Sequence, residues 1–297
     1  MCELPSNEDG LLLPIQGGAA ISDVDLQMQR DDQVLGQPCD NISAKNKNYN
    51  ELTAIYWAWK NIKRLYPNLE YIGLCHYRRY FDFASSFPLA DATIVKPISE
   101  VVNYKLDKKS LERILGSHDI VMAEPLFFRT NLQEQYCVHH ISDDFRTLCK
   151  VVDDLYPEDS YCFYKTMYMN NAFSGYNMTV MKWDLFEQYC TWLFGILQEC
   201  ERRISRYNNN QARVFGFMAE RLFNVWTEKQ KEHGTKIKYV PIILFKGESI
   251  FHIRLRLIRR IISRIIGRLA MFLLYPLRKS TAKQRFNDYL TKLRSTK

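Results

Sequence analysis

The feature that most constrains the fold of this chain is the alternation of short apolar segments with longer helical segments. Turn residues bound segments of strand length at 71–75, 119–123, 172–181 and 238–245. The spacing of apolar residues predicts helices between them, over 46–66, 108–116, 141–154, 160–169, 183–204 and 211–230. Buried strands that alternate with helices indicate an α/β fold, in which helices flank a sheet.

The composition is that of a globular protein. Of the 297 residues, 46% are apolar and 25% are charged, which excludes disorder and low-complexity repeats for most of the chain. The sequence also contains no uncharged apolar run of about 18 residues, the length that a membrane-spanning helix needs. We therefore expect one large α/β domain over residues 1–250.

Positive charge is concentrated in a C-terminal tail, residues 251–297. From His252 onward there are 13 Lys and Arg residues and one acidic residue, which leaves 28 basic and 32 acidic residues in the body. A mildly acidic body argues against nucleic-acid binding. Within 253–275, arginines recur every four residues among Leu and Ile, and Pro276 follows. This pattern predicts a basic amphipathic helix that binds an anionic membrane surface; the alternative is a helix packed on the protein with its arginines in solvent.

The cysteines and the N-terminus indicate a cytosolic protein. Eight cysteines are scattered without a C-x-x-C pair, and the first residues lack the basic and apolar regions of a secretion signal. Cys137, His139 and His140 stand close together, but no second pair at ligand spacing completes a zinc site. We expect reduced thiols and no zinc.

A polar segment precedes the first helix and is the first candidate for donor binding. Its side chains could hydrogen-bond a ribose or a phosphate at a helix N-terminus: Asp40, Asn41, Ser43, Lys45 and Asn46. The helix that follows places Thr53, Trp57 and Lys60 opposite its apolar stripe, so we expect Trp57 to be exposed. The alternative is a capping loop before an ordinary solvated helix face.

His76, Arg78 and Arg79 directly follow the strand at 71–75. Active-site residues of open α/β sheets gather at the carboxyl ends of strands, and two arginines with a histidine could hold a diphosphate there. The alternative is an ion pair with a neighbouring carboxylate such as Asp82.

Two further segments could carry chemistry. On the helix 211–230, Arg213, Glu220 and Asn224 share one face, so that Glu220 could act as general base with Arg213 orienting it. Spacing alone favours an ordinary solvated face. Asn171 and Asn177 flank a strand entry, where their amides could bind sugar hydroxyls or satisfy a bulge.

Several motifs together resemble one bacterial family, long catalogued as a domain of unknown function and found in capsular and exopolysaccharide gene clusters. The motifs are Asp40-Asn-Ile-Ser43, Lys45-Asn46, Tyr49, Glu51-Leu-Thr53, Tyr56-Trp57, Trp59-Lys-Asn61, Tyr71-Ile-Gly-Leu-Cys-His-Tyr-Arg-Arg-Tyr-Phe81, Tyr176-Asn-Met178, Arg213-Val-Phe-Gly-Phe217 and Glu220-Arg-Leu222. Members are regarded as glycosyltransferases of the GT-A type, and some are implicated in galactofuranosyl transfer. The similarity covers about residues 12–245 and excludes the tail.

The resemblance implies a GT-A-like, Rossmann-like sheet that binds a nucleotide-sugar, with UDP as the expected nucleotide. The loop 40–46 and the helix face at Thr53, Trp57 and Lys60 would border the nucleotide, and His76, Arg78 and Arg79 would face the diphosphate. GT-A enzymes commonly carry an Asp-x-Asp metal motif after this strand, where this chain has His-Tyr-Arg-Arg. We therefore expect arginines, rather than Mn²⁺ or Mg²⁺, to meet the leaving-group charge.

The chain also differs from the family at its start. Members usually open with a strand and loop before the segment that matches Leu11–Gly18, and Cys39 stands where a glycine is expected. A missing first strand would favour an alternative role, a non-catalytic, membrane-associated scaffold. RNA binding through the tail is a weaker alternative, because aromatic and basic residues do not interleave there.

The sequence thus predicts a hexosyltransferase of capsule or exopolysaccharide biosynthesis, peripheral on the cytoplasmic face of the membrane. Its acceptor would be a glycan or a lipid-linked sugar.

Overall fold

The structure is a computed structural model that describes residues 9–84, 93–204 and 212–247, together with a few single residues outside these ranges. The amphipathic helix predicted at 253–275 lies outside these ranges. No helix of the described part of the chain is both long and apolar enough to cross a membrane.

A four-stranded sheet forms the centre of the fold, in the order β12 (Ile237–Val240), β8 (Ile120–Ala123), β11 (Thr179–Lys182), β5 (Tyr71–Leu74). β12 runs parallel to β8, whereas β11 runs antiparallel to both β8 and β5. Side chains alternate between the faces: Ile120 and Met122 join one core cluster, and Val121 and Ala123 join another. Both faces of the sheet are therefore buried.

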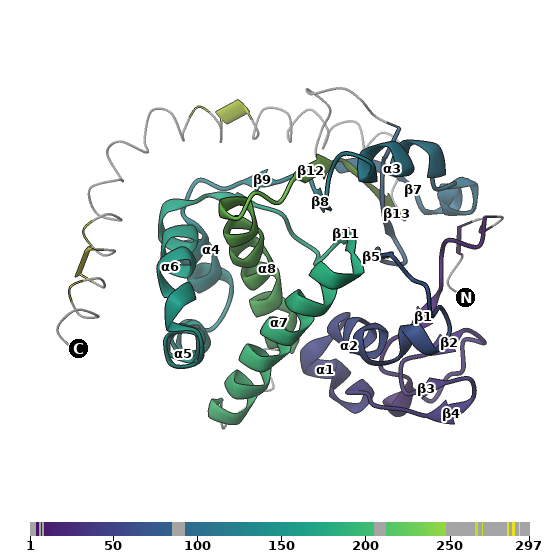
Figure 1. Ribbon diagram of the computed structural model, residues 1–297, viewed down its shortest axis with the longest axis horizontal. Coiled ribbons are helices and arrows are strands. Elements are labelled where there is room, and N and C mark those ends of the chain that lie inside the picture. Colours follow the sequence, from purple (N-terminus) through teal and green to yellow (C-terminus); the bar gives the residue numbers. More distant parts are fainter. Residues whose placement is uncertain are drawn as a thin grey trace.

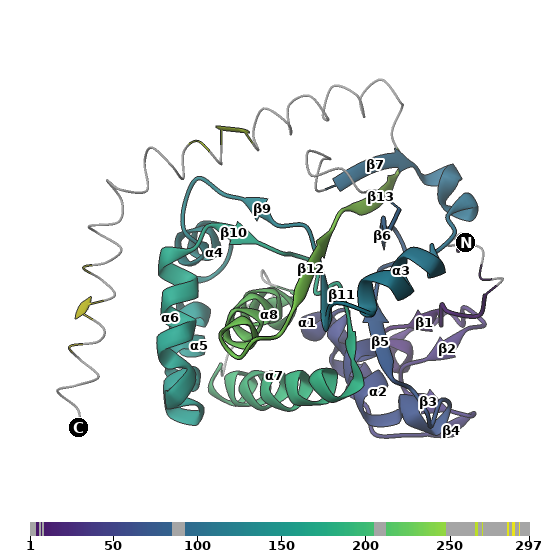
Figure 2. The same ribbon diagram turned by 45° about the horizontal axis from the view of Figure 1, so that its top comes forward.

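Helices cover the two faces unequally. α3 (Lys108–Leu115) packs on the Val121 face through Leu111, Ile114 and Leu115. The larger cluster, on the Ile120 face, includes α2 (Leu52–Asn61), α4 (Leu132–His139), α5 (Ser142–Leu155), α6 (Ser160–Met169), α7 (Trp183–Arg203) and α8 (Val214–Glu232). Figure 1 shows α4, α5 and α6 grouped on the far side of α7 and α8 from β5, and Figure 2 shows α3 on the opposite side of the sheet from α7.

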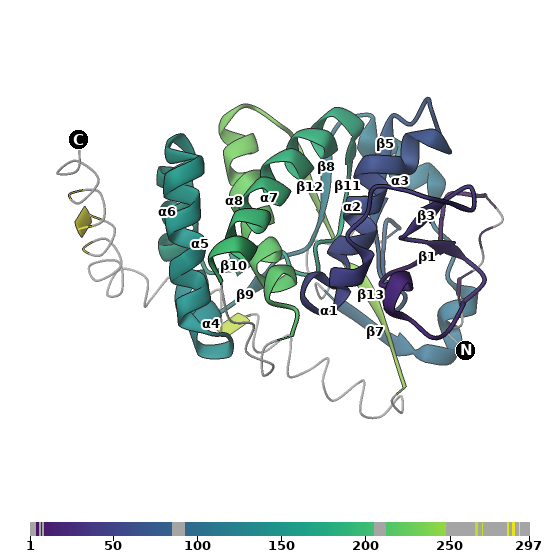
Figure 3. The same cartoon turned by 90° about the horizontal axis from the view of Figure 1, so that it is seen from below.

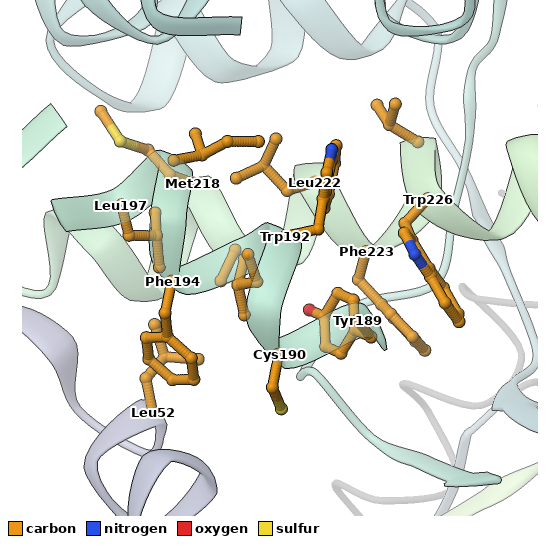
Figure 4. Close-up of a cluster of buried hydrophobic side chains, with 14 of the residues drawn as sticks. Leu52, Tyr189, Cys190, Trp192, Phe194, Leu197, Met218, Leu222, Phe223 and Trp226 are labelled. Atoms are coloured by element: carbon orange, nitrogen blue, oxygen red, sulfur yellow. The ribbon is translucent and has the colours of Figure 1, made fainter. Parts of the chain in front are cut away.

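The two longest helices form the centre of the larger cluster. Tyr189 of α7 packs on Phe223 and Trp226 of α8, and Phe194 of α7 packs on Tyr56 and Trp59 of α2, close to Leu52 (Figure 4). Figure 3, seen from below, shows α7 and α8 between the α5–α6 pair and α2. The first residues of α2 and α8 are therefore packed into the same hydrophobic core.

A second sheet continues from the first. β12 passes through Pro241 into β13 (Ile242–Lys246), which lies between β6 (Arg79–Phe81) and β7 (Thr93–Pro97), with the 3-10 helix Ile98–Asn103 following β7. Sequence analysis predicted a single strand at 238–245. Proline has no N–H to donate, so the ladder ends at Pro241 and resumes on new partners.

The N-terminal region consists of short strand pairs. β1 (Ile15–Gln16) pairs parallel with β2 (Gln29–Arg30), and β3 (Gln33–Val34) forms a hairpin with β4 (Gln37–Pro38).

The remaining short elements lie along the rest of the chain as well. β9 (Leu126–Phe127) and β10 (Ala172–Phe173) form another strand pair. Short 3-10 helices lie at Ala19–Ile21, Ser43–Lys45, Ile62–Arg64 and Pro157–Asp159.

Two further predicted elements are interrupted. The predicted helix 46–66 divides into α1 (Asn46–Tyr49) and α2, because Asn50 adopts φ 53° and ψ −127°. The predicted strand 172–181 divides into β10 and β11, because Tyr176 and Asn177 both have positive φ. Both interruptions lie at the candidate site described next.

Candidate active site

A tight turn carries the predicted cationic residues. His76 and Arg79 exchange two backbone hydrogen bonds of 3.0 Å, and Arg78 O accepts the N–H of Phe245 at 2.8 Å. The turn is thus fixed between the two sheets. The guanidinium carbons of Arg78 and Arg79 lie 4.7 and 4.5 Å from the ring centres of Tyr77 and Tyr176. The Nε atoms of both arginines are buried and have no hydrogen-bond partner in the described structure.

His76 connects this turn to the one between β10 and β11. Its Nε2 lies 2.6 Å from Tyr176 O. Burial lowers the pKa of His76, and the charges of Arg79 and Arg213 lower it further, although Glu51 and the hydrogen bond to Tyr176 oppose this. The imidazole is therefore neutral near pH 7. Because a carbonyl only accepts, Nε2 carries the hydrogen and Nδ1 remains an acceptor.

Glu220 lies on the other side of the same turn. Its Oε1 accepts the backbone N–H of Tyr176 at 2.7 Å, and its Oε2 accepts from Arg221 Nη1 at 3.1 Å. The side chain is 16% exposed. Burial raises the pKa of Glu220, as does the charge of Glu51, against the opposing effects of Arg221, the Tyr176 N–H and Arg213. A carboxylate whose pKa is raised accepts a proton more readily.

Glu51 is a second carboxylate in this site, and sequence analysis gave it no role. Its Oε1 accepts from Asn177 Nδ2 at 2.8 Å, its Oε2 accepts from the Asn50 amide, and Arg213 Nη2 lies 4.0 Å from Oε2. The side chain is 13% exposed. Glu51 belongs to the motif Glu51-Leu-Thr53, but an acidic residue directly before a helix is too common in sequences to indicate a site.

Backbone strain is concentrated at the two carboxylates. Among the described residues, six non-glycines have positive φ, and four of them bear on this site: Asn50 at 53°, Tyr176 at 73°, Asn177 at 52° and Arg213 at 71°. Such conformations cost free energy and persist where the surrounding structure enforces them, commonly at functional sites. Here they place the Tyr176 N–H on Glu220 and the Asn177 amide on Glu51. Arg213 was predicted inside the helix 211–230, but it directly precedes α8 and lies 4.0 Å from Glu51.

The predicted donor loop is held by internal hydrogen bonds. Ser43 Oγ donates to buried Asp31 at 2.5 Å, and Asn46 Nδ2 donates to Thr53 Oγ1 and to Asn50 O, both at 2.9 Å. Ser43 and Thr53 are fully buried. Their polar groups hold the chain next to Asn50 in place, and these side chains have no role in the function proposed.

The expectation that Trp57 is exposed is wrong. Trp57 is 0% exposed, and its Nε1 donates to Gln33 O at 2.7 Å. The β3–β4 hairpin covers this side of α2, and nothing in the local helical pattern encodes that contact.

The other residues predicted around the donor loop are dispersed. Lys45 pairs with Glu201 at 2.8 Å, Asp40 accepts from Tyr56 at 3.1 Å, and the Asn41 amide bonds to Cys39 O at 2.8 Å. Lys60 lies 3.4 Å from the Trp59 ring centre. It is nine residues, or about 14 Å, along α2 from Glu51.

The predicted amides separate into two groups. Asn177 reaches Glu51, whereas Asn171 Nδ2 donates to Phe128 O at 2.8 Å and fastens β9 to β10. Asn224 holds the backbone of Ser174 through both its oxygen and its nitrogen, at 3.0 and 2.8 Å. Glu220 and Asn224 of α8 are therefore bound to the strand entry and do not form the solvated face that spacing alone favours, whereas the Arg213 side chain is 55% exposed.

Metal ligands do not gather in this region. Across the residues described by the structure, no group of three or more His, Cys, Asp or Glu side chains is arranged to hold a metal ion. The described cysteines are all free thiols, and His139 and His140 stack with aromatic neighbours, His140 on Phe217 at 4.1 Å.

Comparison with solved structures supports the fold class. The apo structure of WbbM, a bifunctional glycosyltransferase, matches with a TM-score of 0.70 and 30% sequence identity over 80% of this chain. This chain covers 42% of the WbbM chain. The predicted α/β fold class, a sheet flanked by helices as in glycosyltransferases, is therefore confirmed.

The family follows from the sequence itself. Residues 2–231 match the family described as Domain of unknown function (DUF4422), and the chain belongs to that family. This confirms the resemblance drawn from the motifs. No curated protein matches the chain.

Proposed function

We propose that this protein transfers a hexosyl unit, galactofuranosyl among the candidates, from a UDP-linked donor to a glycan or lipid-linked acceptor in capsule or exopolysaccharide assembly. The observation that carries the proposal is the arrangement around Tyr176. Arg79 lies against the Tyr176 ring and Arg78 is next to it in the chain, both with buried Nε atoms that have no partner in the described structure, while Glu220 and Glu51 accept hydrogen bonds from Tyr176 and Asn177. The likeness to a glycosyltransferase supports the reaction class.

The chemistry assigns a role to each group. An acceptor hydroxyl gives its proton to Glu220 while its oxygen forms a bond to the anomeric carbon of the donor. The bond from that carbon to the diphosphate breaks, and its electron pair leaves with the nucleotide. Arg78 and Arg79 stabilise the charge on the departing diphosphate, because guanidinium groups bind phosphate oxygens through charge-assisted hydrogen bonds. His76 and Arg213 position the neighbouring groups.

Calorimetry with UDP and UDP-hexoses tests the donor site. We expect micromolar binding to the full chain, and a loss of affinity of roughly 100-fold or more in the double variant R78A/R79A, because each charge-assisted bond contributes about 1.5–3 kcal/mol. R146A is the matched control, since Arg146 forms an exposed ion pair with Asp143 on α5. Absence of nucleotide binding to the unsubstituted chain would contradict the proposal and favour the non-catalytic scaffold.

Transfer is expected to be independent of Mn²⁺ and Mg²⁺, because two arginines face the proposed diphosphate position. The rate measured after chelation with EDTA should equal the rate measured after addition of either ion. Strong rescue of the chelated enzyme by one of these metals would show instead that a cation carries the leaving-group charge.

We also propose that the basic tail holds the enzyme at the cytoplasmic face of the membrane, where a lipid-linked acceptor lies. Deletion of residues 252–297, which removes 13 basic residues, should release the protein from phosphatidylglycerol vesicles at moderate salt. Sedimentation with phosphatidylcholine vesicles, which carry no net charge, is the control. A truncated chain that still sediments with the anionic vesicles would refute the tail as the anchor.

A further inference from the structure

Arg221 is a buried arginine that directly follows the proposed base in the chain. Its side chain is 3% exposed, and its Nη1 lies 3.1 Å from Oε2 of Glu220. Adjacent residues of a helix point about 100° apart, so their side chains do not ordinarily face each other. A contact between positions 220 and 221 therefore needs other groups that hold the guanidinium in place.

Three elements supply those groups. Arg221 Nη2 donates to Gln135 Oε1 of α4 at 2.5 Å, and Nη1 also donates to the backbone carbonyl of Phe217, one turn earlier on α8, at 3.1 Å. The guanidinium carbon lies 4.6 Å from the ring centre of Phe173 in β10 and 5.2 Å from that of Tyr136 in α4. Aromatic rings at these distances attract a cation. The guanidinium is thus fixed from α4, β10 and α8, with Nη1 directed at the base.

Stability alone does not account for a buried guanidinium at this position. Removing it from water carries a cost that an ion pair repays only in part, and apolar residues of similar size are often as stable or more stable. The Nε of Arg221 is also buried without a partner in the described structure. A charge that is costly to bury and lies against a carboxylate is typical of a site in which the charge itself is used.

The charges that act on Glu220 come from both ends of the site. Burial raises the pKa of Glu220, Arg221 lowers it, Glu51 raises it and Arg213 lowers it. Arg213 is 55% exposed, so solvent screens its charge, whereas the buried charge of Arg221 is screened much less. The titratable groups that interact with these carboxylates or with Arg221, and that are neutral near pH 7, are His76, Tyr136, His140 and Tyr189.

We propose that Arg221 is a positioning residue for Glu220, which orients the carboxylate and keeps it ionised so that it can accept the proton of a sugar hydroxyl. The Tyr176 N–H fixes Oε1 and Arg221 fixes Oε2, so the carboxylate is held at both oxygens. Each oxygen of an ionised carboxylate accepts about two hydrogen bonds, which leaves room for the acceptor hydroxyl. This role deepens the proposed function and rests on it, but the ion pair itself can be tested without any activity.

The first test is a double-mutant cycle in melting temperature at pH 7, with Arg221→Met and Glu220→Gln. In the otherwise unsubstituted chain, Arg221→Met leaves a largely buried carboxylate without its cation and should lower the melting temperature by roughly 4–6 °C. In the Glu220→Gln background no carboxylate remains, so the same change should lower it by less than half as much. Equal losses in the two backgrounds would overturn the inference, because they would show that Arg221 does not act through Glu220.

The second test is the acidic limb of the transfer rate as a function of pH. Without the positive charge the pKa of Glu220 should rise, so Arg221→Met should move the limb upward by about one pH unit. Arg221→Lys retains the charge and should restore most of the original position. Lys229→Met is the matched control, because Lys229 also forms an ion pair from α8, with Asp159, and its loss should lower stability without moving the limb. An unmoved limb in Arg221→Met, or an equal shift in Arg221→Lys, would overturn the positioning role.

Gln135→Leu provides a test that does not depend on the folding of Arg221→Met. Gln135 is only half-buried, and its replacement removes the acceptor of Arg221 Nη2 while the charge stays in place. A guanidinium released on that side should orient Glu220 less well, so kcat should fall about tenfold while the KM for the UDP-hexose changes less than about twofold. An unchanged kcat would overturn the proposed role of this contact in positioning the base.

These tests separate the inference from the proposed function. A chain that binds no UDP and transfers no sugar refutes the proposed function, and the melting temperatures of the cycle still decide whether Arg221 and Glu220 are coupled. A chain that transfers sugar with an acidic limb indifferent to Arg221→Met refutes the inference alone.

Discussion

Glu220→Gln should reduce the rate of glycosyl transfer about 1,000-fold while leaving UDP affinity within about twofold. Removal of a general base typically costs 100- to 10,000-fold, and glutamine retains the size of glutamate and an oxygen that can accept the Tyr176 N–H. Glu220 is not among the residues proposed to bind the diphosphate, so binding of the nucleotide should survive. Single-turnover rates and calorimetry on the same preparation measure the two effects.

The pH profile distinguishes a base from a merely structural carboxylate. The pKa of Glu220 is raised, chiefly by burial, so the rate should fall as the pH decreases through that raised pKa and the base becomes protonated. Glu51→Gln removes a negative charge that also raises this pKa, and should move the acidic limb to lower pH. If Glu220→Gln retains full activity, or loses nucleotide binding together with activity, Glu220 is not the base.

Asp159→Ala should lower the free energy of unfolding by about 2–4 kcal/mol, the largest stability effect that we expect of a single polar substitution. Asp159 is 2% exposed, accepts from Trp192 Nε1 at 2.9 Å, and pairs with Lys229 Nζ at 2.5 Å. The alanine variant leaves the buried indole N–H without an acceptor. It also removes the contacts that link the start of α6 to α7 and α8. Urea denaturation followed by circular dichroism measures the change.

Two companion variants separate the contribution of the indole hydrogen bond from that of the ion pair. Asp159→Asn retains an acceptor for Trp192 but loses the ion pair, and Lys229→Met removes only the ammonium. Because the Lys229 side chain is partly exposed, the ion pair should contribute less than the indole hydrogen bond. The asparagine variant should therefore recover more than half of the loss. A loss in Asp159→Asn equal to that in Asp159→Ala would show that the charge matters most.

Local patterns predicted the regular elements of this fold well. β5 and β8 lie within one residue of the predicted strands 71–75 and 119–123, and α5, α6 and α7 nearly coincide with predicted helices. These segments have strong apolar periodicity and clear turn boundaries. The short α4 was not predicted, because its polar and apolar residues show little periodicity.

The irregular features depend on contacts that a local pattern does not contain. Asn50 breaks a continuous helical pattern, and the strained turn at Tyr176 and Asn177 divides a continuous strand pattern. The β3–β4 hairpin also covers Trp57, through a tertiary contact of the same kind. Propensity favours the regular alternative in each case, and tertiary hydrogen bonds override it.

The candidate site was predicted in parts. His76 and Arg79 were singled out from the end of a strand and Glu220 from one face of a helix, and the structure brings them to one turn. Glu51 was not singled out, because a carboxylate before a helix is ordinary in sequence. Its partners Asn177 and Arg213 come from segments that are distant in the sequence.

The turn at Tyr176 has a consequence for mutational scanning. The residue contacts Glu220 through its backbone N–H and His76 through its backbone C=O, while its ring lies against Arg79. An alanine at position 176 would remove the ring and leave both backbone contacts in place. The backbone connection between His76 and the proposed base is therefore invisible to side-chain truncation, and only a change to the peptide group itself would remove it.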